Sequence, residues 1–296
     1  MNRKKLGEAL DISSKILRYE LDQFINYKRI IKDVKGKKRK IDLPSIELKK
    51  VQKKLVKFLN RIEKPKYLMS GIKGYSYIDN AKQHLGKEYI LVMDVSNFYP
   101  NCKKEYVYEM FIEKFKMSVD IATILTKLTT HKQTIPTGVA TSQVIAYYAY
   151  SKMFDNINKI AEKYNCDFSL YVDDMTFSSS NKISKAMEKE IKEEVKKYNH
   201  LVKKEKTFYF KPENPKKITG VYLVEHGESL SVPNSLRKDI VTLMKIIESK
   251  YINKINIEYK LIEQLTGKIL AAQQIEPNLF KELNKKLNKI KKTRLD

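Results

Sequence analysis

The sequence predicts an α+β protein in which a central unit of strands and helices is followed by a helical lobe. Three observations favour this class. Residues 89–93 (Tyr-Ile-Leu-Val-Met) form a short apolar run with the length and branching of a buried strand. Phe168, Leu170 and Val172 alternate as they would on one face of a strand. From Leu236 onward, apolar residues recur at the 4-3-4 spacing of one helix face.

The other elements can be expected in order along the chain. The first 60 residues should form a helix, a basic segment that turns at Gly36, and a second helix capped by Ser45. The remaining expected elements are helices over 103–131, 141–163 and 183–199, strands near 207–210 and 218–224, and three C-terminal helices, of which Asn234 caps the first.

The composition is strongly basic. The 59 Lys and Arg residues outnumber the 35 Asp and Glu residues and give a formal net charge of +24. A globular chain with this charge repels itself, and a polyanionic partner, nucleic acid first, is the usual reason for it. No apolar run approaches the roughly 20 residues of a membrane-spanning helix, and no apolar segment follows the basic N-terminus as in a secretory signal. The sequence therefore predicts a cytoplasmic protein that binds nucleic acid and no membrane.

Three carboxylates are the strongest candidates for chemistry. Asp94 ends the predicted strand at 89–93, where an unpaired buried charge is costly. Asp173 and Asp174 lie at the expected tip of a strand–turn–strand unit, and neighbouring side chains act together only where the backbone turns. An isolated Asp-Asp pair is more often structural, but the third acid and the basic chain favour catalysis. Oxygen ligands suit two divalent ions such as Mg²⁺, which serve nucleotidyl transfer.

Other kinds of catalytic site find little support in the sequence. Four scattered histidines and two cysteines, Cys102 and Cys166, indicate neither a zinc site nor a disulfide framework. A Walker-type Gly-x-x-x-x-Gly-Lys loop is missing, so phosphates would be held by metals and basic side chains.

Five segments carry recognisable motifs. They are Asp94–Pro100 (Asp-Val-Ser-Asn-Phe-Tyr-Pro), Ile135–Gln143 (Ile-Pro-Thr-Gly-Val-Ala-Thr-Ser-Gln), Phe168–Phe177 (Phe-Ser-Leu-Tyr-Val-Asp-Asp-Met-Thr-Phe), Lys37–Pro44 and Lys203–Thr207. In order and spacing the first three resemble the palm motifs of reverse transcriptases, and the last two resemble that family's basic fingers segment and lysine-bearing motif. The resemblance covers most of the chain. It implies a right-handed polymerase with fingers, an α/β palm holding a small antiparallel sheet, and a helical thumb.

Two shorter elements narrow the resemblance. Residues 80–84 (Asn-Ala-Lys-Gln-His) are similar to the Asn-Ala-x-x-His element of retron reverse transcriptases, and Ile218-Thr219-Gly220 is similar to their Val-Thr-Gly element. The chain thus resembles a retron-type bacterial reverse transcriptase. The implied domains are an N-terminal fingers region at 1–88, a palm at 89–232 with a fingers insertion at about 103–135, and a helical thumb at 233–296.

The resemblance also implies catalytic and metal-binding positions. Asp94, Val95, Asp173 and Asp174 correspond to positions that hold two Mg²⁺ ions, or Mn²⁺ in their place. Lys206 corresponds to a catalytic lysine that approaches the leaving pyrophosphate.

The resemblance also implies which residues bind the nucleotide and the RNA. Tyr99 would lie under the sugar and exclude a 2′-hydroxyl, while the ring of Phe98 is expected to point into the core. Gly138 could approach a nucleotide closely because it lacks Cβ. The implied nucleotide-binding residues are Arg39, Lys40, Tyr99 and Gly138, and the implied RNA-binding residues are Asn80 and His84.

The chain departs from the family pattern at two places. Thr137 stands where the family commonly has Gln, so the side-chain contact made at this position is open. Ser142-Gln143 stands where Ser-Pro is usual.

The function implied is RNA-directed DNA synthesis from dNTPs. A retron enzyme copies its cognate structured noncoding RNA into multicopy single-stranded DNA joined to RNA, commonly with an effector protein in antiphage defence. One alternative is a stand-alone defence-associated or intron-derived reverse transcriptase with a different template or primer. Another is a non-catalytic RNA-binding scaffold, which the presence of all three acids disfavours.

Overall fold

The computed structural model describes residues 2–34 and 36–293 and mixes helices with small sheets, which confirms the predicted α+β class. The chain forms two compact units. The first contains Met1–Lys73, Met93–Met175 and Ser184–Thr207, and the second contains Gly74–Val92, Thr176–Ile183 and Phe208–Asp296. The division into fingers, palm and thumb stays a prediction.

The first unit begins with a helical layer and a hairpin. Its elements are α1 (Arg3–Leu10), a π-helical turn η1 (Ile16–Glu20), α2 (Leu21–Phe24), β1 (Tyr27–Val34), β2 (Lys37–Pro44) and α3 (Ile46–Leu59). Gly36 turns the hairpin at a φ of +76°, a value that suits glycine. The Oγ of Ser45 accepts a hydrogen bond from the Leu48 N–H at 3.2 Å, so Ser45 caps α3 as expected.

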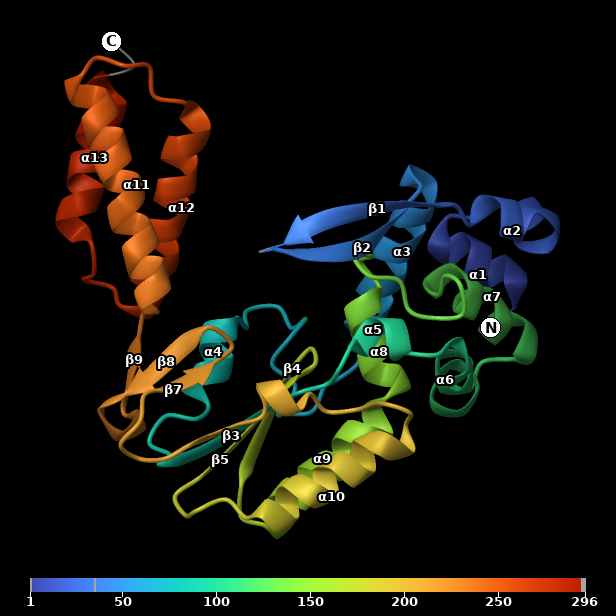
Figure 1. The fold of residues 1–296 in the computed structure, drawn as a ribbon. Coiled ribbons are helices and arrows are strands. Elements are labelled where there is room, and N and C mark those ends of the chain that lie inside the picture. Colours follow the sequence, from blue (N-terminus) through green and yellow to red (C-terminus); the bar gives the residue numbers. More distant parts are fainter. Residues whose placement is uncertain (1, 35, 294–296) are drawn as a thin grey trace. The chain divides into compact units, whose positions relative to one another are not determined.

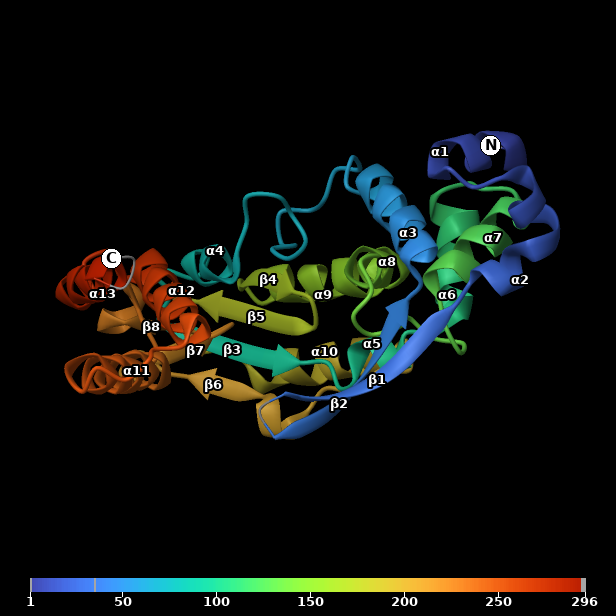
Figure 2. The same ribbon diagram turned by 90° about the horizontal axis from the view of Figure 1, so that it is seen from above.

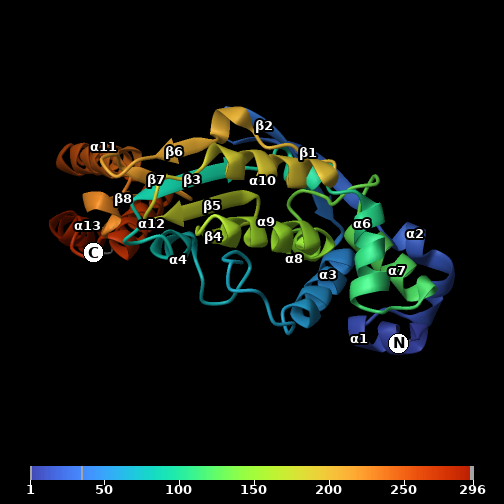
Figure 3. The ribbon, with the colours of Figure 1, turned by 90° about the horizontal axis from the view of Figure 1, so that it is seen from below.

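The middle of the first unit is mostly helical. It contains α5 (Phe98–Asn101), α6 (Lys104–Glu109), a π-helical segment η2 (Met110–Lys114), α7 (Val119–Thr129), α8 (Ser142–Ala149), α9 (Ser151–Lys163) and α10 (Lys185–Lys197). The expectation of one helix over 141–163 was wrong, because the chain leaves the helical conformation at Tyr150. This buried side chain accepts a hydrogen bond from the Lys103 N–H at 3.0 Å and packs its ring 4.7 Å from that of His200. A tertiary contact therefore sets the break. Figure 3 shows α9 and α10 packed side by side.

A four-stranded sheet has the order β4-β5-β3-β6 (Figure 2). Its strands are β4 (Asp167–Tyr171), β5 (Asp174–Ser179), β3 (Tyr89–Asp94) and β6 (Phe208–Phe210). β3 and β6 are antiparallel, with Leu91 opposite Tyr209. The buried strand expected at 89–93 and the strand–turn–strand unit expected at 168–179 are both confirmed.

The second unit joins a small sheet to a helical bundle. Helix α4 (Tyr77–Lys82) packs on β8 (Val221–Val224), which pairs antiparallel with β7 (Lys216–Ile218) and β9 (Ser229–Ser231). Figure 1 shows α11 (Asn234–Ile252), α12 (Tyr259–Ile275) and α13 (Lys281–Thr293) side by side, around fully buried residues such as Ile240, Leu265 and Leu287. Asn234 does not cap α11 as expected, because Pro233 holds the extended cap position and Asn234 is already helical. Among the described residues, none of the helices has the length and apolar character needed to cross a membrane.

Candidate active site

The three candidate carboxylates come together within the first unit. Asp94 is the last residue of β3 and is 3% exposed. Asp173 and Asp174 stand at the turn between β4 and β5 and are partly buried. The Val95 N–H donates to the carbonyl oxygen of Asp173 at 3.1 Å, which ties the end of β3 to this turn. The strand ends therefore bring the acids to one place, as the sequence predicted.

The turn depends on an unusual backbone conformation at Val172. This β-branched residue has a φ of +62°, in a region where such residues are rarely found. Strain of this kind costs about 1–3 kcal/mol and persists where the surroundings enforce it. Here the Oγ of buried Ser70 accepts a hydrogen bond from the Val172 N–H at 2.8 Å, and the Met69 N–H donates to the Leu170 carbonyl at 2.9 Å. The sharp turn allows the adjacent carboxylates, Asp173 and Asp174, to serve one site.

The carboxyl groups affect one another electrostatically. Burial raises the pKa of Asp173, and the negative charge of Asp94 raises it further. Burial also raises the pKa of Asp174, together with the charges of Asp173 and Asp94. Clustered, partly desolvated carboxylates of this kind favour a bound cation, since a cation relieves both the burial cost and the repulsion.

Two lysines neutralise part of this negative charge. Lys203 donates to Oδ1 of Asp94 at 2.5 Å, and Lys206 donates to Oδ2. Lys203 directly precedes the 3-10 turn η3 (Lys204–Lys206), and Lys206 is its last residue. Burial opposes the charged form of Lys206, but the hydrogen bond and charge of Asp94 outweigh it, so the pKa of Lys206 is raised.

Sequence reasoning singled out Lys206 but missed Lys203. The three-residue spacing of the two lysines, which is the repeat of a 3-10 turn, was the available signal. It was hard to notice among 59 Lys and Arg residues.

The adjacent rings of α5 have different surroundings. Phe98 is 3% exposed, and its ring packs against those of Tyr150, Phe154 and His200 at 5.2–5.9 Å. Tyr99 is partly exposed, and its pKa is raised first by burial and then by the charge of Asp173. Phe98 thus belongs to the core, while the phenol of Tyr99 interacts with a candidate catalytic acid.

The hairpin that carries Arg39 and Lys40 is tied to the loop at 135–138. Both basic side chains are exposed on β2. The Asp42 N–H donates to the Thr137 carbonyl at 3.0 Å. Gly138 has a φ of +92°, and a Cβ there would lie 2.6 Å from Cγ2 of Ile41. The close approach expected at Gly138 is therefore made, in this structure, by the chain's own hairpin.

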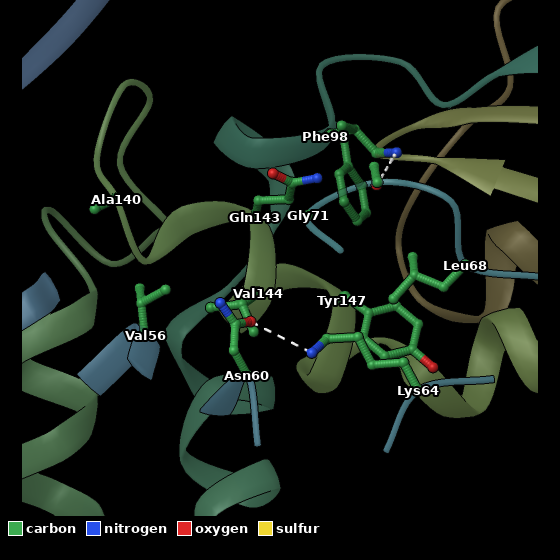
Figure 4. A pocket seen from close by; sticks show the side chains of 12 residues that line it. Val56, Asn60, Lys64, Leu68, Gly71, Phe98, Ala140, Gln143, Val144 and Tyr147 are labelled. Atoms are coloured by element: carbon green, nitrogen blue, oxygen red, sulfur yellow. Dashed lines mark hydrogen bonds between the residues drawn. The ribbon is translucent and has the colours of Figure 1, made fainter. Parts of the chain in front are cut away.

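A cavity of about 150 Å³ borders the turn between β4 and β5 (Figure 4). Val172 and Phe98 line it, together with Tyr147 and the polar side chains of Gln143, Asn60 and Lys64. Lys64 donates to Oδ1 of Asn60 at 3.3 Å, and burial lowers the pKa of Lys64. Apolar walls with amide and ammonium groups suit part of a nucleotide, which has an apolar ring face and polar edges.

The candidate RNA-binding residues lie in the second unit, and both are buried. Asn80 donates to Oγ1 of Thr219 at 3.4 Å, and Thr219 donates to the Tyr77 carbonyl at 2.9 Å. Nδ1 of His84 is 2.7 Å from Oγ of Ser178. The elements around Asn80 and Thr219 therefore contact one another, although they are far apart in sequence.

The donor set fits divalent metals by its chemistry. Within residues 2–34 and 36–293, no three His, Cys, Asp or Glu side chains stand in an arrangement ready to hold a metal ion. The oxygens of Asp94 are instead directed to the two lysines. Three carboxylates that repel one another are nevertheless ligands of the kind that Mg²⁺ and Mn²⁺ prefer, and Val95 could add a carbonyl oxygen.

Comparison with protein families gives a match over residues 30–223, more than half of the chain, to the family described as reverse transcriptase (RNA-dependent DNA polymerase). Similar curated proteins include the retron Se72 reverse transcriptase of Salmonella heidelberg, 32% identical over 50% of this chain and 39% of that protein. The retron Ec86 reverse transcriptase of Escherichia coli is 27% identical over 81% of this chain and 76% of that protein. The match to the first relative thus spans well under half of that protein.

Solved structures support the same fold. Apo telomerase from Candida tropicalis aligns with a TM-score of 0.56 at 14% identity, over 77% of this chain and 53% of that chain. A form of it truncated from the C-terminal domain aligns with a TM-score of 0.54 at 16% identity, over 71% of this chain and 55% of that chain. At these identities the likeness shows the fold alone.

Proposed function

Because the chain belongs to the reverse transcriptase family and is similar to retron members of it, we propose that it copies a structured noncoding RNA into multicopy single-stranded DNA. The observation that carries this proposal is the convergence of Asp94, Asp173 and Asp174 at the strained turn. Such a cluster on a chain of net charge +24 suits the transfer of nucleotides along a nucleic-acid template.

Residues of the chain would bind the metal ions and the leaving pyrophosphate at this cluster. Asp94, Asp173 and Asp174, with the carbonyl of Val95, would hold two Mg²⁺ or Mn²⁺ ions. When bound, such ions supply charge that activates an attacking hydroxyl and stabilises a leaving pyrophosphate. Lys206 already contacts Asp94 and would turn to the pyrophosphate oxygens.

Residues of the β1–β2 hairpin and of α5 would bind and select the incoming nucleotide. Arg39 and Lys40 are exposed and would meet the triphosphate of the incoming dNTP. Tyr99 lies within electrostatic reach of Asp173 and would occupy the space that a ribose 2′-hydroxyl needs. Gly138 would support nucleotide binding by holding the hairpin against its loop.

RNA recognition is proposed for the element around α4. The burial of Asn80 and His84 gives this proposal a definite form: the two side chains would shape the surface that meets RNA instead of touching it themselves. By its similarity to retron enzymes, the protein would work in the cytoplasm with its cognate RNA and DNA product. An effector protein of the same antiphage system would be a further partner.

The test is to purify the protein from cells that express its native genomic neighbourhood and to sequence the nucleic acid bound to it. We expect one structured RNA and a DNA copy of part of it, joined through a 2′-hydroxyl and separable by debranching enzyme. The Asp173→Asn variant should retain the RNA and lose the DNA. DNA copied from another RNA, or started from another primer, would favour a stand-alone or intron-derived enzyme. RNA without DNA in both proteins would favour a scaffold.

A further inference from the structure

Both carboxylate oxygens of Asp94 are engaged by cations of the chain itself. Lys203 donates to Oδ1 at 2.5 Å and Lys206 donates to Oδ2, while the Asp94 side chain is only 4% exposed. A divalent ion ligated by Asp94 needs these same oxygen atoms. Metal binding and lysine binding at this residue therefore compete.

The backbone fixes the lysines in this position. The Lys203 N–H donates to the Asp94 carbonyl at 2.9 Å, and the Ser96 N–H donates to the Leu201 carbonyl at 2.7 Å. The hydroxyl of Thr207 in turn donates to the Lys203 carbonyl at 2.9 Å. The segment that carries both ammonium groups is thus bonded to the end of β3, so the lysines cannot drift away from the site as exposed lysines on a loop would.

The two lysines differ in their freedom to leave. The side chain of Lys206 is 46% exposed, whereas that of Lys203 is 22% exposed. Lys206 is therefore the freer of the two to turn outward to a phosphate, whereas Lys203 is more closely confined beside Asp94. Its positive charge would remain beside any metal ion that displaced it, and like charges in a partly desolvated site repel strongly.

We propose that Lys203 is a positioning residue that holds Asp94 away from divalent metals until a nucleotide is bound. The triphosphate of the nucleotide is an alternative anionic partner for the ammonium group. When Lys203 turns to the phosphates, the Asp94 oxygens become available to the ions that arrive with the nucleotide. The free enzyme would thus bind metal weakly, and the complete site would form with its substrate.

This inference rests on the proposed assignment of Asp94, Asp173 and Asp174 to the metal site. The test is a titration of the nucleotide-free protein with Mn²⁺, in which the electron paramagnetic resonance signal of the free ion reports how much Mn²⁺ remains unbound. Lys203→Gln removes the charge but keeps a hydrogen-bond donor. Lys204→Gln is the matched control, because it removes the same charge from an exposed position in the same turn.

We expect Lys203→Gln to bind Mn²⁺ about tenfold more tightly than the wild type, since removal of one nearby charge is worth at least that much. Lys204→Gln and Lys203→Arg should match the wild type. With a chain-terminated primer, template and dNTP present, the difference between Lys203→Gln and the wild type should shrink.

Two contrary results are distinguishable. Equal Mn²⁺ affinity for the wild type and Lys203→Gln, with binding weakened by Asp174→Asn, would overturn the role of Lys203 and leave the metal site in place. Mn²⁺ binding that Asp174→Asn does not change would overturn the metal site as well. Melting temperatures of all variants establish that the comparisons are made on folded protein.

Discussion

Replacement of Gly138 by Ala should test how the hairpin is positioned. Two costs can be worked out from the structure. At a φ of +92° an alanine is strained, at a cost of about 1–3 kcal/mol. The new Cβ would also lie 2.6 Å from Cγ2 of Ile41, a contact that must be relieved by movement. Ile41 is β-branched and stiff at χ1, so the strand β2 itself should move.

Movement of β2 has a functional consequence. The Asp42 N–H bond to the Thr137 carbonyl should lengthen, and Arg39 and Lys40, which directly precede Ile41, should shift with the strand. We expect the KM for dNTP to rise about tenfold, equivalent to about 1.4 kcal/mol, with a smaller change in kcat. The assay is single-nucleotide incorporation on a primed RNA template, with urea unfolding to measure stability.

The Ile41→Ala background separates the clash from the backbone strain. If the hairpin contact is responsible, adding Gly138→Ala to Ile41→Ala should leave KM nearly unchanged relative to Ile41→Ala alone. The loss of stability from the positive φ should persist in both backgrounds. The reasoning would be refuted by an equal rise in KM in both backgrounds, because Gly138 would then act on the nucleotide and not through Ile41.

Further predictions concern Phe98 and Tyr99 in α5, and His200, whose ring packs against that of Phe98. Tyr99→Ala should raise the ratio of rNTP to dNTP kcat/KM. Phe98→Ala should cost about 3–5 kcal/mol of stability and leave this ratio unchanged. The opposite pattern would mean that Phe98, and not Tyr99, excludes the 2′-hydroxyl. Burial lowers the pKa of His200 from 6.5 to about 4, so the unfolded chain binds the proton first as pH falls. Stability should therefore be lost between those two values, by up to about 3 kcal/mol. Urea unfolding across this range should show a smaller loss for His200→Phe, and an equal loss would assign the effect to another group.

The sequence was informative where local rules decide the structure. A single acid at the end of an apolar run placed Asp94 at a strand end, because charge is costly inside a strand. The capping of α3 by Ser45 was predictable from the preference of hydroxyl side chains for helix caps. The adjacent acids at 173 and 174 required a turn, and the structure has one.

Other features depend on contacts between distant segments. The helix break at Tyr150 follows from its contacts with Lys103 and His200, which no local pattern encodes. The positive φ of Val172 is stabilised by Ser70, about a hundred residues earlier in the chain. In the sequence Lys203 cannot be told from the many surface lysines, and only its hydrogen bond to Asp94 distinguishes it.

The most direct test of the proposed active site is the incorporation of labelled dNTP on a primed RNA template with Mg²⁺, by the wild type and by the Asp173→Asn and Asp174→Asn variants. Loss of a carboxylate removes a ligand of the ions that stabilise the reacting phosphate. Each variant should lose DNA synthesis by about a hundredfold to a thousandfold while keeping its melting temperature and its affinity for RNA. Near-normal turnover by both variants would contradict the assignment of these carboxylates to catalysis.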